Sequence, residues 1–237
     1  MKLFVIFLTL IFVIGAGCAQ NKTMSERIIL KTSDEINIIG TYRNTNQEKI
    51  ALLFHMMPAT KESWESFAEK LSKYGYASLA IDERGHGEST MNGELNYKNF
   101  SDAQQQAKRL DVEAAIAFAK EKGFEENRIV LIGASIGANL AIQALVEHKN
   151  ISTAVVLSPG LDYHGVLTAP AIQNLGGNQK VILVASDDDS ESFESVQVLH
   201  KKNPEQTILI ERSGIGHGTQ MTDHDNGLIE EILKYIP

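Results

Sequence analysis

Ser135 lies in a segment whose residue types suit nucleophilic chemistry. The sequence Gly133-Ala-Ser-Ile-Gly137 follows the apolar run 129–132 directly, and small residues that favour a helix come next. A G-x-S-x-G sequence between a strand and a helix is the pattern of a sharp turn that exposes its serine hydroxyl. The two glycines leave room where the strand and the helix pass close together. Ser135 is therefore a candidate nucleophile, although G-x-S-x-G alone also arises by chance.

A serine hydroxyl is a weak nucleophile near neutral pH and needs a general base. His217 is the favoured candidate among the seven histidines, because glycines flank it in Gly214-Ile-Gly-His-Gly218, after the apolar run 207–210. Glycines on both sides let such a loop carry the imidazole close to another part of the backbone. His164 is a further histidine that could line the pocket.

Three consecutive carboxylates, Asp187, Asp188 and Asp189, follow the apolar run 181–185. A catalytic histidine needs an acid that holds its tautomer, and the chain order serine, acid, histidine is the one that accompanies this kind of turn. Open α/β sheets hold their ligands at the carboxyl ends of their strands. Spacing alone does not choose among the three aspartates, and Asp162, one strand earlier, is an alternative acid.

Acyl transfer also needs two backbone N–H groups for the developing oxyanion. Ile136, directly after the candidate nucleophile, provides one. The other is expected from the loop 55–58, after the apolar run 50–54. Backbone donors do not depend on side-chain type, so the side chains of Met56 and Met57 are free to line an acyl pocket.

The elements that must position these residues alternate between apolar runs and helical patterns. Strands are expected at 28–30, 36–39, 50–54, 77–81, 129–132, 153–157, 181–185 and 207–210, and helices at 64–74, 102–122, 138–147, 192–201 and 226–235. This alternation predicts an α/β fold in which helices cover both faces of a mostly parallel sheet. The segment 158–180 has room for one short helix near 170–175 and is too short for a large lid.

Residues 1–17 indicate an export signal. Lys2 precedes an apolar run from Leu3 to Ile14 that is interrupted only by Thr9. The run is shorter than the roughly 20 apolar residues of a membrane span and is typical of a secretory signal.

Cys18, the single cysteine, follows small residues in an arrangement that resembles a bacterial lipobox. We expect residues 18–25 to be a lipidated cysteine and a polar tether, and residues 26–237 to be the folded domain. This predicts an exported protein anchored to the membrane at the bacterial cell envelope. Release as a soluble secreted or periplasmic protein is the alternative.

The composition is that of a globular protein, with 43% hydrophobic and 22% charged residues. The formal net charge is −8, and no basic patch or aromatic-basic stripe appears, which argues against a nucleic-acid partner. No pattern implies a metal or an organic cofactor.

Taken in order, four segments of residues 26–237 resemble the α/β-hydrolase superfamily. They are Leu53-Phe-His-Met-Met-Pro58, Ala80-Ile-Asp-Glu-Arg-Gly-His-Gly-Glu-Ser89, the turn around Ser135, and Ile215-Gly-His-Gly218. The resemblance implies that Met57 provides the second oxyanion donor, although Met56 replaces the family's usual glycine. It selects Asp188, three residues after Ala185, as the acid. It also implies a structural role for His86. The chain is most similar to small lidless members, such as dienelactone-hydrolase-like and serine-peptidase-like esterases.

The resemblance therefore implies an α/β-hydrolase fold and a serine hydrolase that cleaves a carboxylic ester through an acyl-enzyme. Ser135 would attack, His217 would act as base, Asp188 would orient it, and Met57 and Ile136 would hold the oxyanion. A small-molecule ester or acyl compound is the expected substrate. Peptidase, thioesterase and acyltransferase activities use the same residues and stay open. A non-catalytic envelope lipoprotein that uses the fold as a binding module is the alternative from another class.

Overall fold

The computed structural model describes residues 24–44, 47–225 and 227–237. The predicted export signal over 1–17 and the candidate lipidation site Cys18 lie outside the described residues. The predicted tether 18–25 overlaps the fold, because the first strand begins at Met24 and pairs Ser25 with Arg43.

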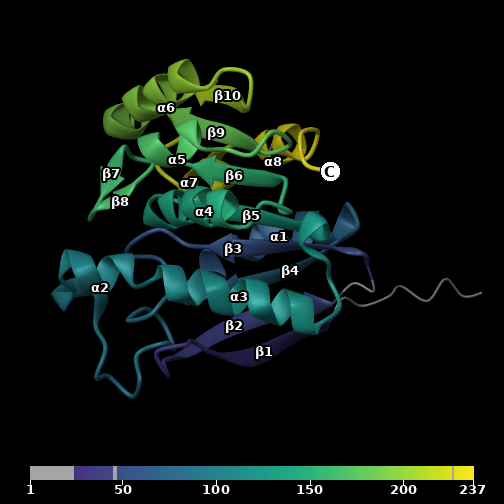
Figure 1. Cartoon of the computed structure of the whole chain (residues 1–237), viewed down its shortest axis with the longest axis vertical. Helices are drawn as coiled ribbons and strands as arrows, with labels where there is room; N and C mark the ends of the chain where they lie inside the picture. The colour runs from purple at the N-terminus through teal and green to yellow at the C-terminus, as the bar shows by residue number, and fades with distance from the viewer. Residues whose placement is uncertain (1–23, 45–46, 226) are drawn as a thin grey trace, which may run out of the picture.

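An eight-stranded sheet forms the centre of the fold, in the order β1-β2-β4-β3-β5-β6-β9-β10 (Figure 1). Strands β1 and β2 are antiparallel to their neighbours, and the six that follow are parallel. The strands are β1 Met24–Lys31, β2 Asn37–Asn44, β3 Lys49–Phe54, β4 Tyr76–Ile81, β5 Ile129–Ala134, β6 Thr153–Leu157, β9 Lys180–Ser186 and β10 Thr207–Arg212.

Helices cover both faces of this sheet, as predicted. They are α1 Glu65–Lys73, α2 Asp102–Gln106, α3 Arg109–Glu121, α4 Ile136–Glu147, α5 Ala169–Gln173, α6 Ser190–Lys202, α7 Gln220–His224 and α8 Leu228–Ile232, with short 3₁₀ turns at Lys61–Trp64, Tyr97–Asn99 and Glu126–Arg128. Helices α3, α4 and α6 lie on the face nearer the viewer in Figure 1. No large lid is present among the described residues.

Each parallel strand contributes side chains to two hydrophobic cores, because successive side chains point to opposite faces of the sheet. In β3, Leu52 and Phe54 join the core under α3, α4 and α6, whereas Ala51 and Leu53 join the core that contains Trp64 of the turn before α1. All five side chains are fully buried. Burial on both faces explains why the parallel strands read as unbroken apolar runs.

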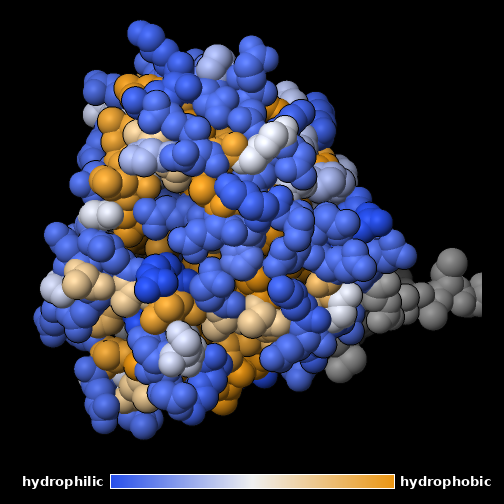
Figure 2. All heavy atoms as spheres, in the orientation of Figure 1, coloured by the Kyte–Doolittle hydropathy of each residue, from blue (hydrophilic) through white to orange (hydrophobic). Residues whose placement is uncertain are grey.

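The outer surface is mostly polar on the face that Figure 2 shows. Hydrophilic residues cover most of this face, and hydrophobic residues show between them as separate patches. This pattern agrees with the ordinary charged content of the sequence.

Two expected helices differ in the structure from their predicted ranges. The segment 102–122 forms α2 and α3, with tight turns between them in which Lys108 N–H donates to Gln105 O and Asp111 N–H to Lys108 O. The break turns the Lys108 side chain inward to a buried ion pair with Glu83. The closing helix expected at 226–235 is shortened to α8, and a separate short helix, α7, lies ahead of it.

A small hairpin, β7 Asp162–Tyr163 and β8 Val166–Leu167, was not predicted. It occupies the connection between β6 and β9, ahead of the short helix α5 expected near residue 170. The hairpin lies at the left of Figure 1, beyond the ends of the parallel strands.

Candidate active site

Ser135 connects β5 to α4 in a strained backbone conformation, with φ 54° and ψ −121°. A side chain other than glycine in this region costs about 1–3 kcal/mol, and such strain gathers at functional sites. The flanking glycines are required sterically: a Cβ on Gly133 would lie 2.1 Å from Gly137 O, and one on Gly137 would lie 2.5 Å from Phe54 O. The predicted sharp turn at Ser135 is confirmed.

His217 is paired with Asp189. Its Nδ1 lies 2.7 Å from Asp189 Oδ2, and the side chains are 33% and 16% exposed. A neutral His217 in this pair donates Nδ1–H to the carboxylate, which leaves Nε2 free to accept a proton. The sequence analysis placed Asp188 in this position, and that assignment is wrong.

The error has a physical cause in the end of the preceding strand. Strand β9 continues to Ser186, which pairs with Arg212, so the strand ends one residue later than predicted. A turn then follows, closed by a hydrogen bond from Asp189 N–H to Ser186 O. This turn directs Asp189, three residues after the true strand end, toward His217.

The other two aspartates hold the backbone of the histidine loop. Asp188 accepts hydrogen bonds from Gly216 N–H at 3.0 Å and from the Ser186 hydroxyl, and these bonds lower its pKa. Asp187 accepts from Gly214 N–H at 3.0 Å and from a neighbouring serine hydroxyl. The alternative acid Asp162 instead accepts from Gly165 N–H within the β7–β8 hairpin.

The histidine loop lies against the turn that carries Ser135. A Cβ on Gly218 would be 3.4 Å from the Cβ of Ala134, the residue before Ser135. Gly218 N–H also donates to Ser158 Oγ at 2.9 Å, which ties the loop to the end of β6. No hydrogen bond joins Ser135 to His217 within the described part of the chain, and such bonds are often long before substrate binds.

The two residues expected to provide oxyanion donors lie in the turn after β5 and in the loop after β3. Ile136 is the first residue of α4, so its N–H lies in the first turn, where helix amides have no partner within the helix. The second candidate donor, Met57, lies in the loop after β3. Met56 reaches the histidine loop, since a Cβ on Gly218 would be 2.5 Å from Met56 Sδ, whereas Met57 packs against the core under α4.

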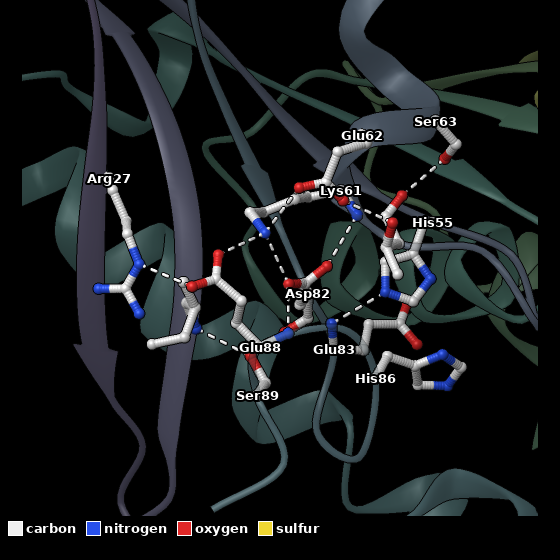
Figure 3. A network of polar contacts seen from close by, with 12 residues as sticks. Arg27, His55, Lys61, Glu62, Ser63, Asp82, Glu83, His86, Glu88 and Ser89 are labelled. Carbon is white, nitrogen blue, oxygen red and sulfur yellow. Dashed lines mark hydrogen bonds and ion pairs between the residues drawn. The ribbon is translucent and has the colours of Figure 1, made fainter. Parts of the chain in front are cut away.

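His55 anchors the peptide unit that contains the Met57 amide. Its Nε2 accepts a hydrogen bond from Glu83 N–H at 3.0 Å, so its Nδ1 carries the proton and donates to Met56 O at 3.0 Å (Figure 3). Burial lowers the pKa of His55 and keeps the ring neutral. The Met56 carbonyl and the Met57 N–H belong to one planar, trans unit and point in opposite directions. Fixing the carbonyl therefore fixes the direction of the Met57 N–H.

A buried polar network surrounds Glu83, the residue whose backbone N–H binds His55. Lys108 and Glu83, both with fully buried side chains, form an ion pair at 2.9 Å. Lys108 also donates to His86 Nε2 at 3.2 Å, and burial together with the Lys108 charge lowers the pKa of His86 to about 2. The neutral His86 ring stacks on Tyr97 with a centroid distance of 3.9 Å.

Asp82 forms the neighbouring part of this network. Its carboxylate accepts hydrogen bonds from the backbone N–H and from the ammonium of Lys61, each at 2.8 Å. Figure 3 shows Lys61 and Asp82 with their partners around the loop that follows β4. They hold the loops after β3 and β4 together.

Tyr163, in the β7–β8 hairpin, is a site residue that sequence reasoning missed. Its hydroxyl lies 3.0 Å from Ser192 Oγ, and Ser192 Oγ in turn donates to Ser158 O, at the end of β6, at 3.3 Å. The local signal was a turn-forming His164-Gly165 pair beside an aromatic residue. His164, considered as a pocket residue, pairs instead with Asp102 at 3.0 Å, on the exposed side of the hairpin.

Among the described residues no group of three or more histidine, cysteine, aspartate or glutamate side chains could hold a metal ion. No helix in that same part of the chain has the length and apolar character of a membrane span.

Comparison with solved structures gives the same fold. An esterase from Pyrococcus furiosus is 20% identical and superposes with a TM-score of 0.74 over 90% of this chain and 89% of that one. A dienelactone hydrolase from Anabaena variabilis is 14% identical, with a TM-score of 0.71 over 90% of this chain and 94% of that one. An acylaminoacyl peptidase from Pyrococcus horikoshii is 13% identical, with a TM-score of 0.68 over 91% of this chain and 42% of that one.

No curated protein matches the chain. The family model described as serine aminopeptidase, S33, matches residues 45–202, which include β3, the Ser135 turn and Asp189. The match covers more than half of the chain and agrees with the sheet and its helices. The chain therefore belongs to this hydrolase family, within the α/β-hydrolase superfamily.

Proposed function

We propose that the protein is a serine hydrolase that cleaves a small carboxylic ester through an acyl-enzyme. The observation that carries the proposal is the 2.7 Å pair of His217 and Asp189 on a loop that packs against the strained turn of Ser135. A nucleophile, a base and an orienting acid on different loops of one sheet edge are the arrangement that acyl transfer uses.

In the first half-reaction, Ser135 Oγ forms a bond to the ester carbonyl carbon while its proton passes to His217 Nε2. The carbonyl electron pair moves to the oxygen, which the N–H groups of Met57 and Ile136 stabilise. Collapse of this intermediate breaks the bond to the alkoxy oxygen, and His217 returns the proton to the leaving alcohol. Water then repeats the sequence on the acyl-enzyme and releases the acid.

Asp189 keeps Nε2 unprotonated in the resting state and stabilises the imidazolium when it forms. The His55–Glu83 contacts support the Met57 donor by fixing its peptide unit.

A fluorophosphonate probe tests the proposal directly. The intact protein should be labelled at Ser135, as located by peptide mapping, and Ser135→Ala should abolish both labelling and hydrolysis of a 4-nitrophenyl ester. A folded protein with no labelling and no hydrolysis would support the alternative of a non-catalytic binding module.

A matched panel separates the activities that share this chemistry. We expect ester substrates to be cleaved faster than aminoacyl amides, thioesters or acyl-transfer pairs with the same acyl group. The family description names an aminopeptidase, so faster cleavage of an aminoacyl amide would replace the ester proposal while keeping the roles of Ser135 and His217.

We further propose that the chain is exported and lipidated at Cys18, which anchors it to the membrane of the cell envelope. The apolar run and the small residues before Cys18 support this proposal. Cells grown with a labelled fatty acid should incorporate label into the wild-type protein and not into Cys18→Ser. Incorporation into neither form would favour the soluble secreted or periplasmic alternative.

A further inference from the structure

The β7–β8 hairpin is held in place from the helix that begins at the nucleophile. Asn139, one turn after Ser135, is fully buried; its Oδ1 accepts from Gly160 N–H at 3.1 Å and its Nδ2 donates to Val166 O at 2.8 Å. Thr168 Oγ1 closes the base of the hairpin by donating to Gly160 O at 2.7 Å. Asn139 thus fixes both strands of the hairpin relative to Ser135.

This anchoring places Tyr163 beside the end of β6, where Ser192 contacts Ser158 and where Leu157 O accepts from Ser135 N–H at 2.9 Å. A Cβ on Gly160 would lie 2.6 Å from the Tyr163 ring, so the ring packs flat over this glycine. The Tyr163 hydroxyl is held at 3.0 Å by Ser192 Oγ. Ser192 is fully buried, and its Oγ lies 3.3 Å from Ser158 O.

The order of the strands decides on which side of Ser135 the phenol lies. Strand β5 carries Ser135 and has β3 on one side and β6 on the other. The oxyanion donor Met57 follows β3. Tyr163 follows β6, on the side of β9 and β10, and the loops after these two strands carry Asp189 and His217.

A tetrahedral intermediate at Ser135 has its oxyanion directed to the Met57 side and its leaving-group oxygen directed to His217, which must protonate it. A hydroxyl on the His217 side therefore meets the leaving-group oxygen. We propose that Tyr163 is a substrate-contacting residue of this site, whose hydroxyl turns its proton from Ser192 Oγ to the alkoxy oxygen of the ester as the bond to the acyl carbon breaks. The inference rests on the proposed function.

The phenol keeps its proton throughout this step, and the proton that the alcohol gains still comes from His217. Burial raises the pKa of Tyr163 above its usual value, so the hydroxyl stays a donor over the working range of a histidine base. The benefit is largest for an alcohol that leaves as a strong base. The protein would thus cleave esters of ordinary aliphatic alcohols and not activated esters alone.

Leaving-group dependence tests the role of Tyr163. Ethyl and 4-nitrophenyl esters of the same acid are compared by kcat/KM, which reports the acylation step for both. A hydrogen bond that develops with charge corresponds to roughly 10- to 100-fold in rate. Tyr163→Phe, which keeps the ring over Gly160, should lose about this factor on the ethyl ester and less than about threefold on the 4-nitrophenyl ester.

Ser192→Ala keeps the phenol and removes its anchor, so it should shift the ratio of the two rates in the same direction by a smaller factor. Tyr235→Phe, at a 41% exposed tyrosine, is the matched control and should leave the ratio unchanged. Equal losses on both esters, or no loss, in Tyr163→Phe would overturn the inference while fluorophosphonate labelling of Ser135 upholds the hydrolase. A wild-type protein that is neither labelled nor active would overturn both.

Discussion

The pairing of His217 with Asp189 rather than Asp188 yields the sharpest prediction. Asp189→Asn keeps the size of the side chain and removes its charge. When the introduced amide places its NH₂ where Asp189 Oδ2 lies, His217 Nδ1 must accept the hydrogen bond instead of donating it. The ring proton then lies on Nε2. The nitrogen that should accept the Ser135 proton is then already protonated.

The expected loss can be set from this geometry. Both the tautomer and the stabilisation of the imidazolium depend on the single 2.7 Å contact, since no other carboxylate reaches the His217 ring within the described residues. The comparable change in a serine protease lowers kcat by about 10⁴. At 1.36 kcal/mol for each factor of ten, that is about 5.4 kcal/mol of lost transition-state stabilisation.

Asp188→Asn is the matched control because it is the neighbouring residue and undergoes the same chemical change. Asp188 contacts Gly216 N–H and Ser186, not the imidazole. An asparagine carbonyl can still accept from Gly216, so we expect a loss of less than about tenfold.

Steady-state kinetics with a 4-nitrophenyl ester, with circular dichroism to confirm folding, gives both numbers. The reasoning is refuted if Asp188→Asn loses several orders of magnitude and Asp189→Asn does not. Equal, modest losses in both variants would also refute it, because they would mean that neither carboxylate sets the tautomer.

Three further predictions concern stability, measured by urea unfolding. Lys108→Met should cost about 3–5 kcal/mol by leaving the buried Glu83 carboxylate unpaired, and Lys108→Met with Glu83→Gln should recover most of it; an unchanged stability in the single variant would contradict the buried pair. Gly137→Ala should destabilise by at least about 1–3 kcal/mol, because its Cβ meets the Phe54 carbonyl oxygen at 2.5 Å, whereas Gly177→Ala, in open space, should change little. Hydrogen bonding to Glu113 raises the pKa of His148, so protonated His148 stabilises the fold. This stabilisation is complete below the unfolded pKa of about 6.5 and is lost as the pH rises through the raised folded pKa; the stability difference between wild type and His148→Gln should therefore shrink with rising pH, and a constant difference would contradict the pairing.

Features that depend on local sequence were predictable. The run 129–132 and the glycines around Ser135 specify a strand, a sharp turn and a helix within a dozen residues, and the structure has them. The parallel sheet followed from apolar runs that are buried on both faces. Neither inference needed a contact between distant parts of the chain.

The acid could not be placed because its position depends on a distant strand. Strand β9 ends at Ser186 because Arg212 of β10 pairs there, and no local pattern marks that pairing. The helix expected over 102–122 was divided for a similar reason, since Lys108 turns inward to meet Glu83. Tyr163 was missed because its hairpin is held by Asn139, a residue that reads locally as part of a helix.

Each of the three consecutive aspartates binds one residue of the histidine loop. Asp187 binds Gly214, Asp188 binds Gly216 and Asp189 binds His217, so two loops from neighbouring strands are joined at three successive points. These three contacts depend more on the length of the histidine loop than on the identity of its side chains. Removing Ser213, which precedes all three contacts, would displace Gly214, Gly216 and His217 at once, whereas a substitution at Asp187 or Asp188 affects one of the three contacts. The spacing between β10 and His217 is thus a stricter requirement than the side chains that fill it.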